Sequence, residues 1–277
     1  MNIKNLKDIP PWEWPTHAGQ MLLEVLQDSQ ISNSERLLAA ELSGDSVVIN
    51  DELADALLAI LSNPREPDPL RGQAAISLGP ALEYADIDGF EDPDDDVPIT
   101  EPLFLKIRRT LQKLYMDAET PKEVKRPVLE ASVRAPEKWH KNAVAAAYRS
   151  KDEDWKLTAV FCMQFLRGFD KQILESLKSQ NPDIHYHAVC AAGNWEIDAA
   201  WPHMAALVAS EETEKELRLS AIEAAAFIRP QKASEILSPL LHSDDEDIVA
   251  TVHESLAMAG GLDEDEEDDD EGPVTVH

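Results

Sequence analysis

The chain has 277 residues, of which 43% are hydrophobic and 29% are charged, enough for one large core or two small ones. Its formal net charge of -29 opposes wrapping on nucleic acid or adsorption to an anionic membrane. Two cysteines are too few for a disulfide framework, and we find no apolar run suited to a membrane span or a signal peptide. We therefore expect a cytoplasmic protein.

The first 31 residues combine an irregular Pro- and Trp-rich segment with one expected helix. The segment is PPWEWP at 10–15, and the helix AGQMLLEVLQ at 18–27 is suited to capping the element that follows. Prolines favour an extended chain on which Trp12 and Trp14 point to opposite sides. These tryptophans either seal the first repeat or form an aromatic anchor for a partner.

From residue 32 onward a short pattern recurs, which predicts a repeated helix. A polar start is followed by Leu or Ile, often a basic residue, and then small and apolar residues at helical spacing. The clearest copies are DPLRGQAAISLG at 68–79, NPDIHYHAVCAAG at 181–193 and EKELRLSAIEAAA at 214–226; weaker ones begin near residues 34, 122, 152 and 245. The residue after the leading position marks each copy: Arg36, Arg71, Lys125, Lys156, His185, Arg218 and Val249. Five of the six intervals lie near thirty residues, and the second is about twenty longer.

A second helix is expected in each period, after the first. Apolar residues recur at helical spacing over 52–62, 101–115, 141–150, 171–177, 199–209 and 232–241. Asn181-Pro182 is a start signal for a first helix, and Gly79 and Gly193 stand where first helices are expected to stop. The long interval contains an acidic, Pro-containing stretch, which predicts an inserted loop over 84–100. The acidic residues 262–277 predict a disordered tail.

Helical hairpins of this kind must stack to cover their apolar faces. The pattern therefore predicts an all-α fold, a right-handed α-α superhelix of about six helical-hairpin repeats plus a terminal half-repeat over 32–261. Small residues such as Ala74, Ala188 and Ala221 would let first helices approach closely. The segment LRGQAAISLG resembles the basic-x-x-Ala-Ala-x-x-Leu-Gly core of HEAT-like repeats, so the chain is similar to the HEAT-repeat, armadillo-type superfamily. The resemblance implies that second helices line a concave face.

The charge is unevenly distributed along the chain. Sixteen acidic residues lie in two runs, Asp263–Glu271 and Asp86–Asp96, whereas residues 101–178 hold 16 basic and 11 acidic side chains. Ordinary solvated helix faces explain this middle region, or it forms a basic strip that binds an acidic peptide or the chain's own acidic segments. The candidate partner-binding residues of the strip are Lys106, Arg109, Lys113, Lys138, Lys141 and Arg149.

Some HEAT-like proteins are enzymes, but their site residues are not found in this sequence. Deoxyhypusine hydroxylases hold two irons through several His-Glu pairs, whereas this chain has a single pair, His253-Glu254. Cys162 and Cys190 lie among small apolar residues, which favours inert thiols and gives too few ligands for zinc. No EF-hand, phosphate loop or nucleophile motif occurs. We therefore predict no catalytic residue, no metal and no cofactor.

The sequence thus predicts a non-enzymatic scaffold that binds a protein or peptide along the concave face of a HEAT-like solenoid. Its acidic segments would steer basic partners toward it and repel nucleic acid. The alternative is a HEAT-like enzyme or assembly factor, bilin-lyase-like or hydroxylase-like, with a pocket that periodicity does not reveal.

Overall fold

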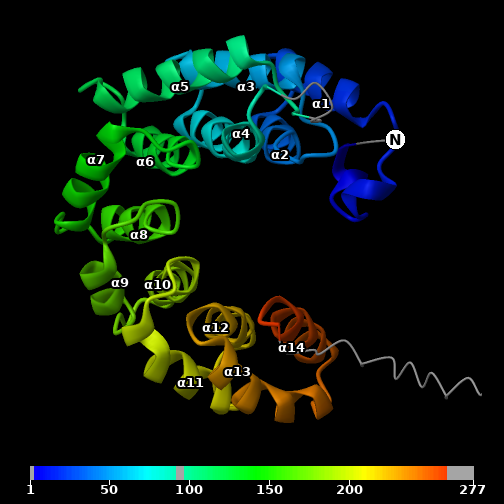
Figure 1. Cartoon of the computed structure of the whole chain (residues 1–277). Coiled ribbons are helices and arrows are strands. Elements are labelled where there is room, and N and C mark those ends of the chain that lie inside the picture. Colours follow the sequence, from blue (N-terminus) through cyan, green and yellow to red (C-terminus); the bar gives the residue numbers. More distant parts are fainter. Residues whose placement is uncertain (1–2, 92–96, 261–277) are drawn as a thin grey trace, which may run out of the picture. The chain divides into compact units, whose positions relative to one another are not determined.

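The computed structural model describes residues 3–91 and 97–260 and consists of two compact units, Met1–Leu166 (unit 1) and Arg167–His277 (unit 2). Every regular element in the described residues is a helix, so the predicted all-α class is confirmed (Figure 1). In those same residues no helix is both long and apolar enough to cross a membrane. The predicted tail at 262–277 lies outside the described residues.

Unit 1 contains eight α-helices and two short 3₁₀ turns within its described residues. The turns are η1 (Ile3–Leu6) and η2 (Pro11–Glu13), and the helices are α1 (Ala18–Gln27), α2 (Asn33–Leu42), α3 (Asp51–Ser62), α4 (Asp68–Asp88), α5 (Glu101–Met116), α6 (Lys122–Ser132), α7 (Lys138–Tyr148) and α8 (Glu153–Cys162). The predicted first helices are α2, α4, α6 and α8, and the predicted second helices are α3, α5 and α7.

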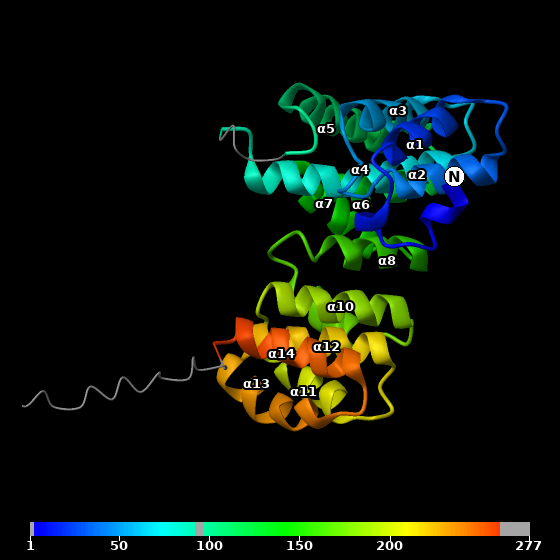
Figure 2. The same cartoon turned by 90° about the vertical axis from the view of Figure 1, so that its right-hand side faces the viewer.

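Unit 2 continues the same alternation. Its elements are α9 (Asp170–Ser176), α10 (Pro182–Asn194), η3 (Asp198–Ala200), α11 (Trp201–Ala209), α12 (Lys215–Ile228), α13 (Pro230–Leu237), η4 (Ser238–His242) and α14 (Glu246–Met258). First helices α10, α12 and α14 pack in succession, and α11 packs against α13 in a second layer (Figure 2). The predicted stack of helical hairpins is therefore present in each unit.

The layers of unit 1 correct one expectation. First helices α2, α4, α6 and α8 pack in succession on the inner side of the bend of this unit, whereas α1, α3 and α5 form the outer layer (Figure 1). The family resemblance implied the opposite, with second helices lining the concave face. The small, tightly packed side chains belong to the first helices. These helices approach one another closely, and they form the inner layer of unit 1.

The end of α4 is a second correction. Gly79 does not stop this helix, which continues through Pro80 to Asp88, so the predicted loop over 84–100 begins inside a helix. The continuation is buried through Ala81, Leu82 and Ala85. Gly79 has a packing role instead, because a Cβ there would lie 2.8 Å from Cδ of Arg134 on the segment after α6. Glycine is therefore required at this position because the Arg134 side chain packs closely against it, and not because the helix ends there.

Three of the marker residues are arginines, and each binds its first helix to the helix that precedes it. Arg36, Arg71 and Arg218 donate hydrogen bonds to the carbonyl oxygens of Leu26, Leu61 and Val208, each ten residues earlier. Those carbonyls lie in the last turn of α1, α3 and α11, where backbone oxygens lack helical partners and the helix dipole attracts a cation. At these three markers the basic residue of the sequence pattern therefore caps a helix C-terminus.

Arg71 tests this role because it is nearly fully buried and its Nε lies 3.1 Å from the Leu61 oxygen. Arg71→Met keeps the apolar stem and removes the donor, so we expect the free energy of unfolding to fall by about 2 kcal/mol. Urea unfolding of the whole chain measures the change. Arg65→Met, at an exposed loop position, is the matched control and should leave the midpoint unchanged. Equal effects of the two substitutions would contradict the capping role.

Candidate functional site: an acidic groove on unit 1

The six basic residues singled out from the sequence are all exposed, on or next to α5 and α7. Lys106 forms an ion pair with Asp55 of α3, at 2.6 Å, and Arg109 donates from Nε to the Leu105 carbonyl of its own helix. These second helices are not on the inner layer of unit 1, so the structure does not place the residues in a concave groove. Whether Lys113, Lys138, Lys141 and Arg149 contact a partner stays a prediction.

The two N-terminal tryptophans have different surroundings. Trp14 packs against the core, and its indole Nε1 donates to the carbonyl oxygens of Leu6 and Ile9, at 2.9 and 3.2 Å. Trp12 is 78% exposed. Trp14 thus seals the N-terminal end of unit 1, and only Trp12 remains available as an aromatic anchor.

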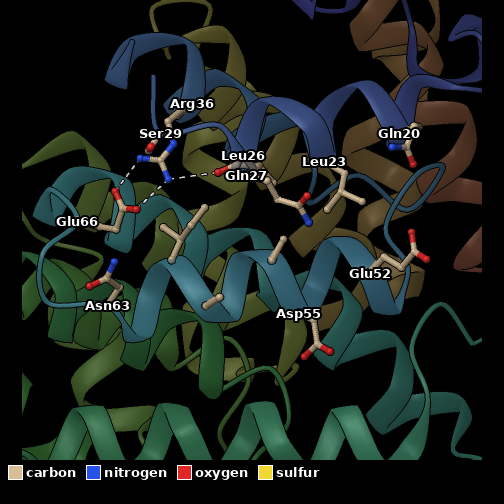
Figure 3. Close-up of a pocket in the computed structure, with 13 residues that line it drawn as sticks. Gln20, Leu23, Leu26, Gln27, Ser29, Arg36, Glu52, Asp55, Asn63 and Glu66 are labelled. Atoms are coloured by element: carbon tan, nitrogen blue, oxygen red, sulfur yellow. Dashed lines mark hydrogen bonds and ion pairs between the residues drawn. The ribbon is translucent and has the colours of Figure 1, made fainter. Parts of the chain in front are cut away.

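A groove on unit 1 lies between α1 and α3, with a cavity volume of about 750 Å³ (Figure 3). We call it the α1–α3 groove. Its floor is apolar, and its rim is built from amide and carboxylate side chains. The floor consists of Leu23, Leu26, Ala56, Ala59 and Ile60, and the polar residues are Gln20, Gln27, Ser29, Arg36, Glu52, Asp55, Asn63 and Glu66.

One end of the groove is closed by a bidentate ion pair. Arg36 donates from Nη1 and Nη2 to the two carboxylate oxygens of Glu66, at 2.7 and 2.9 Å (Figure 3). The hydrogen bond from Arg36 holds the pKa of Glu66 below its usual value, against the opposing effect of burial. Because Arg36 also binds the Leu26 carbonyl, it joins α1, α2 and the loop before α4. This end of the groove is therefore rigid and electrically neutral.

The rest of the rim carries an excess of negative charge. Glu52 and Asp55 project from α3 on exposed positions, and the only lining cation, Arg36, is already paired with Glu66. Lys106 reaches Asp55 from α5, but both side chains remain more than half exposed. An exposed pair of this kind contributes little binding energy of its own and can exchange partners. The groove is chemically suited to a ligand with an apolar face and basic side chains.

A second exposed apolar surface lies on α4 in the inner layer. We call it the α4 stripe, and it consists of Ile76, Pro80, Tyr84 and Ile87, spaced so that they share one face of the helix. Ile87 is 75% exposed, which is unusual for a large aliphatic side chain. We treat the stripe as the competing surface in the binding experiment below.

The cysteines behave as the sequence predicted. Cys162 is fully buried in α8, and burial raises the pKa of its thiol well above the ordinary value. Cys190 is partly buried, and burial likewise raises its pKa. Both thiols are therefore protonated and weakly nucleophilic at neutral pH. The predicted lone His253-Glu254 pair is exposed on α14. In the described part of the chain no three His, Cys, Asp or Glu side chains gather as a metal site.

Burial strongly shifts the pKa of His140, and the role of this residue is structural. The backbone N–H of Glu137 donates to its Nδ1 at 2.8 Å, so the ring proton is on Nε2, which donates to Ser132 Oγ at 2.9 Å. Ser132 in turn donates to the Leu129 carbonyl. Burial lowers the pKa of His140 to about 4. The neutral ring therefore connects the start of α7 to the end of α6.

The sequence matches no protein-family model and no curated protein. Two solved structures resemble the fold. The Escherichia coli protein YibA is 15% identical, with a TM-score of 0.45, over 89% of this chain and 84% of that one. Human deoxyhypusine hydroxylase in complex with glycerol is 15% identical, with a TM-score of 0.40, over 93% of this chain and 88% of that one. At this level of similarity neither structure transfers an activity, a ligand or a residue role.

The buried His140 predicts a specific pH dependence of stability. Its folded pKa of about 4 lies below the unfolded value of 6.5, so the unfolded chain takes up the proton first as the pH falls. Stability is therefore full above pH 6.5 and is lost toward pH 4, by about 3 kcal/mol in total. His140→Gln cannot titrate, so the wild-type free energy of unfolding should decline more steeply than that of the variant across this window. Urea titrations at several pH values measure the difference, and parallel curves would contradict it.

Proposed function

We propose that this chain is a non-enzymatic scaffold that binds another protein, and that the partner presents a basic, amphipathic helical segment to the α1–α3 groove. The observation that carries the proposal is the groove itself, in which the uncovered Ala56 and Ala59 lie over buried apolar residues and inside an acidic rim. The acidic balance of the whole chain supports the same partner chemistry, since it attracts basic segments over several ångströms of solvent.

The dimensions of the groove fit a short helix. Helix α3 has 12 residues, which corresponds to about 18 Å of length and to a partner helix of about three turns. Such a segment binds through apolar side chains at positions i, i+3 or i+4, and i+7. Ala56 and Ala59 lie along α3 at a spacing of one turn and are short enough to leave room for these side chains.

The rim decides which amphipathic segments would bind. Lys or Arg side chains flanking the apolar face can pair with Glu52 and with Asp55, which would exchange its contact with Lys106. An acidic segment would face Glu52 and Asp55, of which only Asp55 has a cation, Lys106, beside it. Specificity therefore comes from charge, whereas the apolar floor supplies most of the affinity.

Blocking the floor should abolish this binding. Ala59→Arg fills the groove and places a cation where a basic segment would lie, so we expect the Kd to rise at least about tenfold, or ~1.4 kcal/mol. The probe is a fluorescein-labelled helical peptide of about 14 residues with Leu on one face and Lys on the other, followed by fluorescence anisotropy. Glu52→Lys should weaken binding less, by about threefold. Glu123→Lys, an exposed acid on α6, is the charge-matched control and should bind as the wild type does.

Four further measurements complete the test. A peptide with Glu in place of Lys should not bind, and binding of the Lys peptide should weaken as NaCl rises from about 0.05 to about 0.5 M. Ile87→Lys disrupts the α4 stripe, and a loss of binding in this variant but not in Ala59→Arg would refute the groove. Iron or an absorbing chromophore in the purified chain would refute the non-enzymatic part of the proposal.

A further inference from the structure

Two histidines from different helices meet in unit 2, outside the proposed binding groove. His185 stands near the start of α10 and His203 lies within α11. Their Nε2 atoms are 2.7 Å apart, and the ring planes are inclined at 62°. Both rings are partly buried, and this burial lowers the pKa of each, so both are neutral at pH 7. Neutral imidazole is the form that binds a metal.

The two Nε2 atoms face each other across a short gap. A single N–H···N hydrogen bond occupies that gap when one ring carries its proton on Nε2. If that ring moves its proton to Nδ1, two lone pairs converge instead, and no proton is released in the change. With metal–nitrogen distances of about 2.0 Å and a tetrahedral angle, the two Nε2 atoms would be about 3.3 Å apart. The two Nε2 atoms need to separate by about 0.6 Å to reach that spacing.

One of the two histidines also lines a cavity. His203 lines a cavity of about 490 Å³ between α9 and α11, whose other walls are Leu174, Leu177, Lys178, Ala199, Pro202 and Ala206. Water from this cavity can complete the coordination sphere of a bound ion. Lys178 is exposed and its charge opposes a cation, which favours an ion that imidazole binds strongly over one that prefers carboxylates.

We propose that His185 and His203 form a two-histidine site for one divalent transition-metal ion of the imidazole-binding class, Cu²⁺ or Zn²⁺, held through both Nε2 atoms with water as the remaining ligands. The site would tie α10 to α11 more firmly than the shared hydrogen bond does. The site is independent of the α1–α3 groove. It would not bind Mg²⁺ or Ca²⁺, because these ions require oxygen donors.

The experiment adds Cu²⁺ to the full chain and measures binding by titration calorimetry and by electron paramagnetic resonance. We expect one ion per chain with nitrogen hyperfine splitting from two imidazoles, and an affinity that His203→Gln lowers by about tenfold or more. Gln can still hydrogen-bond to His185, so this variant keeps the α10–α11 contact while removing the ligand. His185→Ala should have the same effect on affinity, and His253→Ala, at an exposed position on α14, should have none.

The acidic runs of the chain also attract cations, and the design separates them from the site. Excess Mg²⁺ saturates carboxylates without competing for imidazole. Loss of Cu²⁺ binding under excess Mg²⁺, or an unchanged affinity in His203→Gln and His185→Ala, would refute the site. Far-UV circular dichroism of each variant verifies that the helices are intact.

Discussion

The close approach of neighbouring first helices is the constraint on which both units depend. In unit 2 a Cβ on Gly193 of α10 would lie 2.8 Å from the Cβ of Ala224 on α12, and in unit 1 a Cβ on Gly72 of α4 would lie 3.0 Å from the Glu123 carbonyl oxygen. Real Cβ atoms essentially never approach another heavy atom within 3.0 Å, so larger side chains at these contacts would push the helices apart. A tight first-helix layer leaves the outer helices more widely spaced, and in unit 1 the α1–α3 groove opens in that outer layer.

The contacts of Arg36, Arg71 and Arg218 are a second constraint, because they hold three first helices against the helices that precede them. A helix C-terminus has carbonyl oxygens without partners, and a buried guanidinium is one of the few groups that can satisfy them while remaining charged. Arg36 does this for Leu26 and in the same place binds Glu66. A structural cap thereby forms one wall of the groove. At this end of unit 1 the same residue, Arg36, therefore both joins the repeats and lines the candidate binding groove.

The helices were predictable because their signals are local, whereas the candidate sites depend on packing between helices. The marker pattern located every first helix, and Asn181 caps α10 as expected, with its side chain accepting from two backbone N–H groups. The prediction that Gly79 ends a helix was wrong, because a glycine required for close packing and one required for a turn look alike in sequence. Ala56 and Ala59 carry no sign that they are left uncovered, since Ala is common on both faces of a helix. His185 and His203 are 18 residues apart on different helices, and only the packing of α10 and α11 brings them together.

Several of the chain's basic side chains form ion pairs between neighbouring repeats. Lys122 binds Asp152 and Asp154, and Lys215 binds Asp245 and Asp247, so that each lysine at the start of one first helix holds the acidic start of the next. Arg229 binds Asp198 in the same inter-repeat manner. These three cations join repeats, and each contacts one or two of the more numerous carboxylates. The carboxylates left over face solvent, which is why the groove rim on α3 is acidic and why a basic partner is the better electrostatic match.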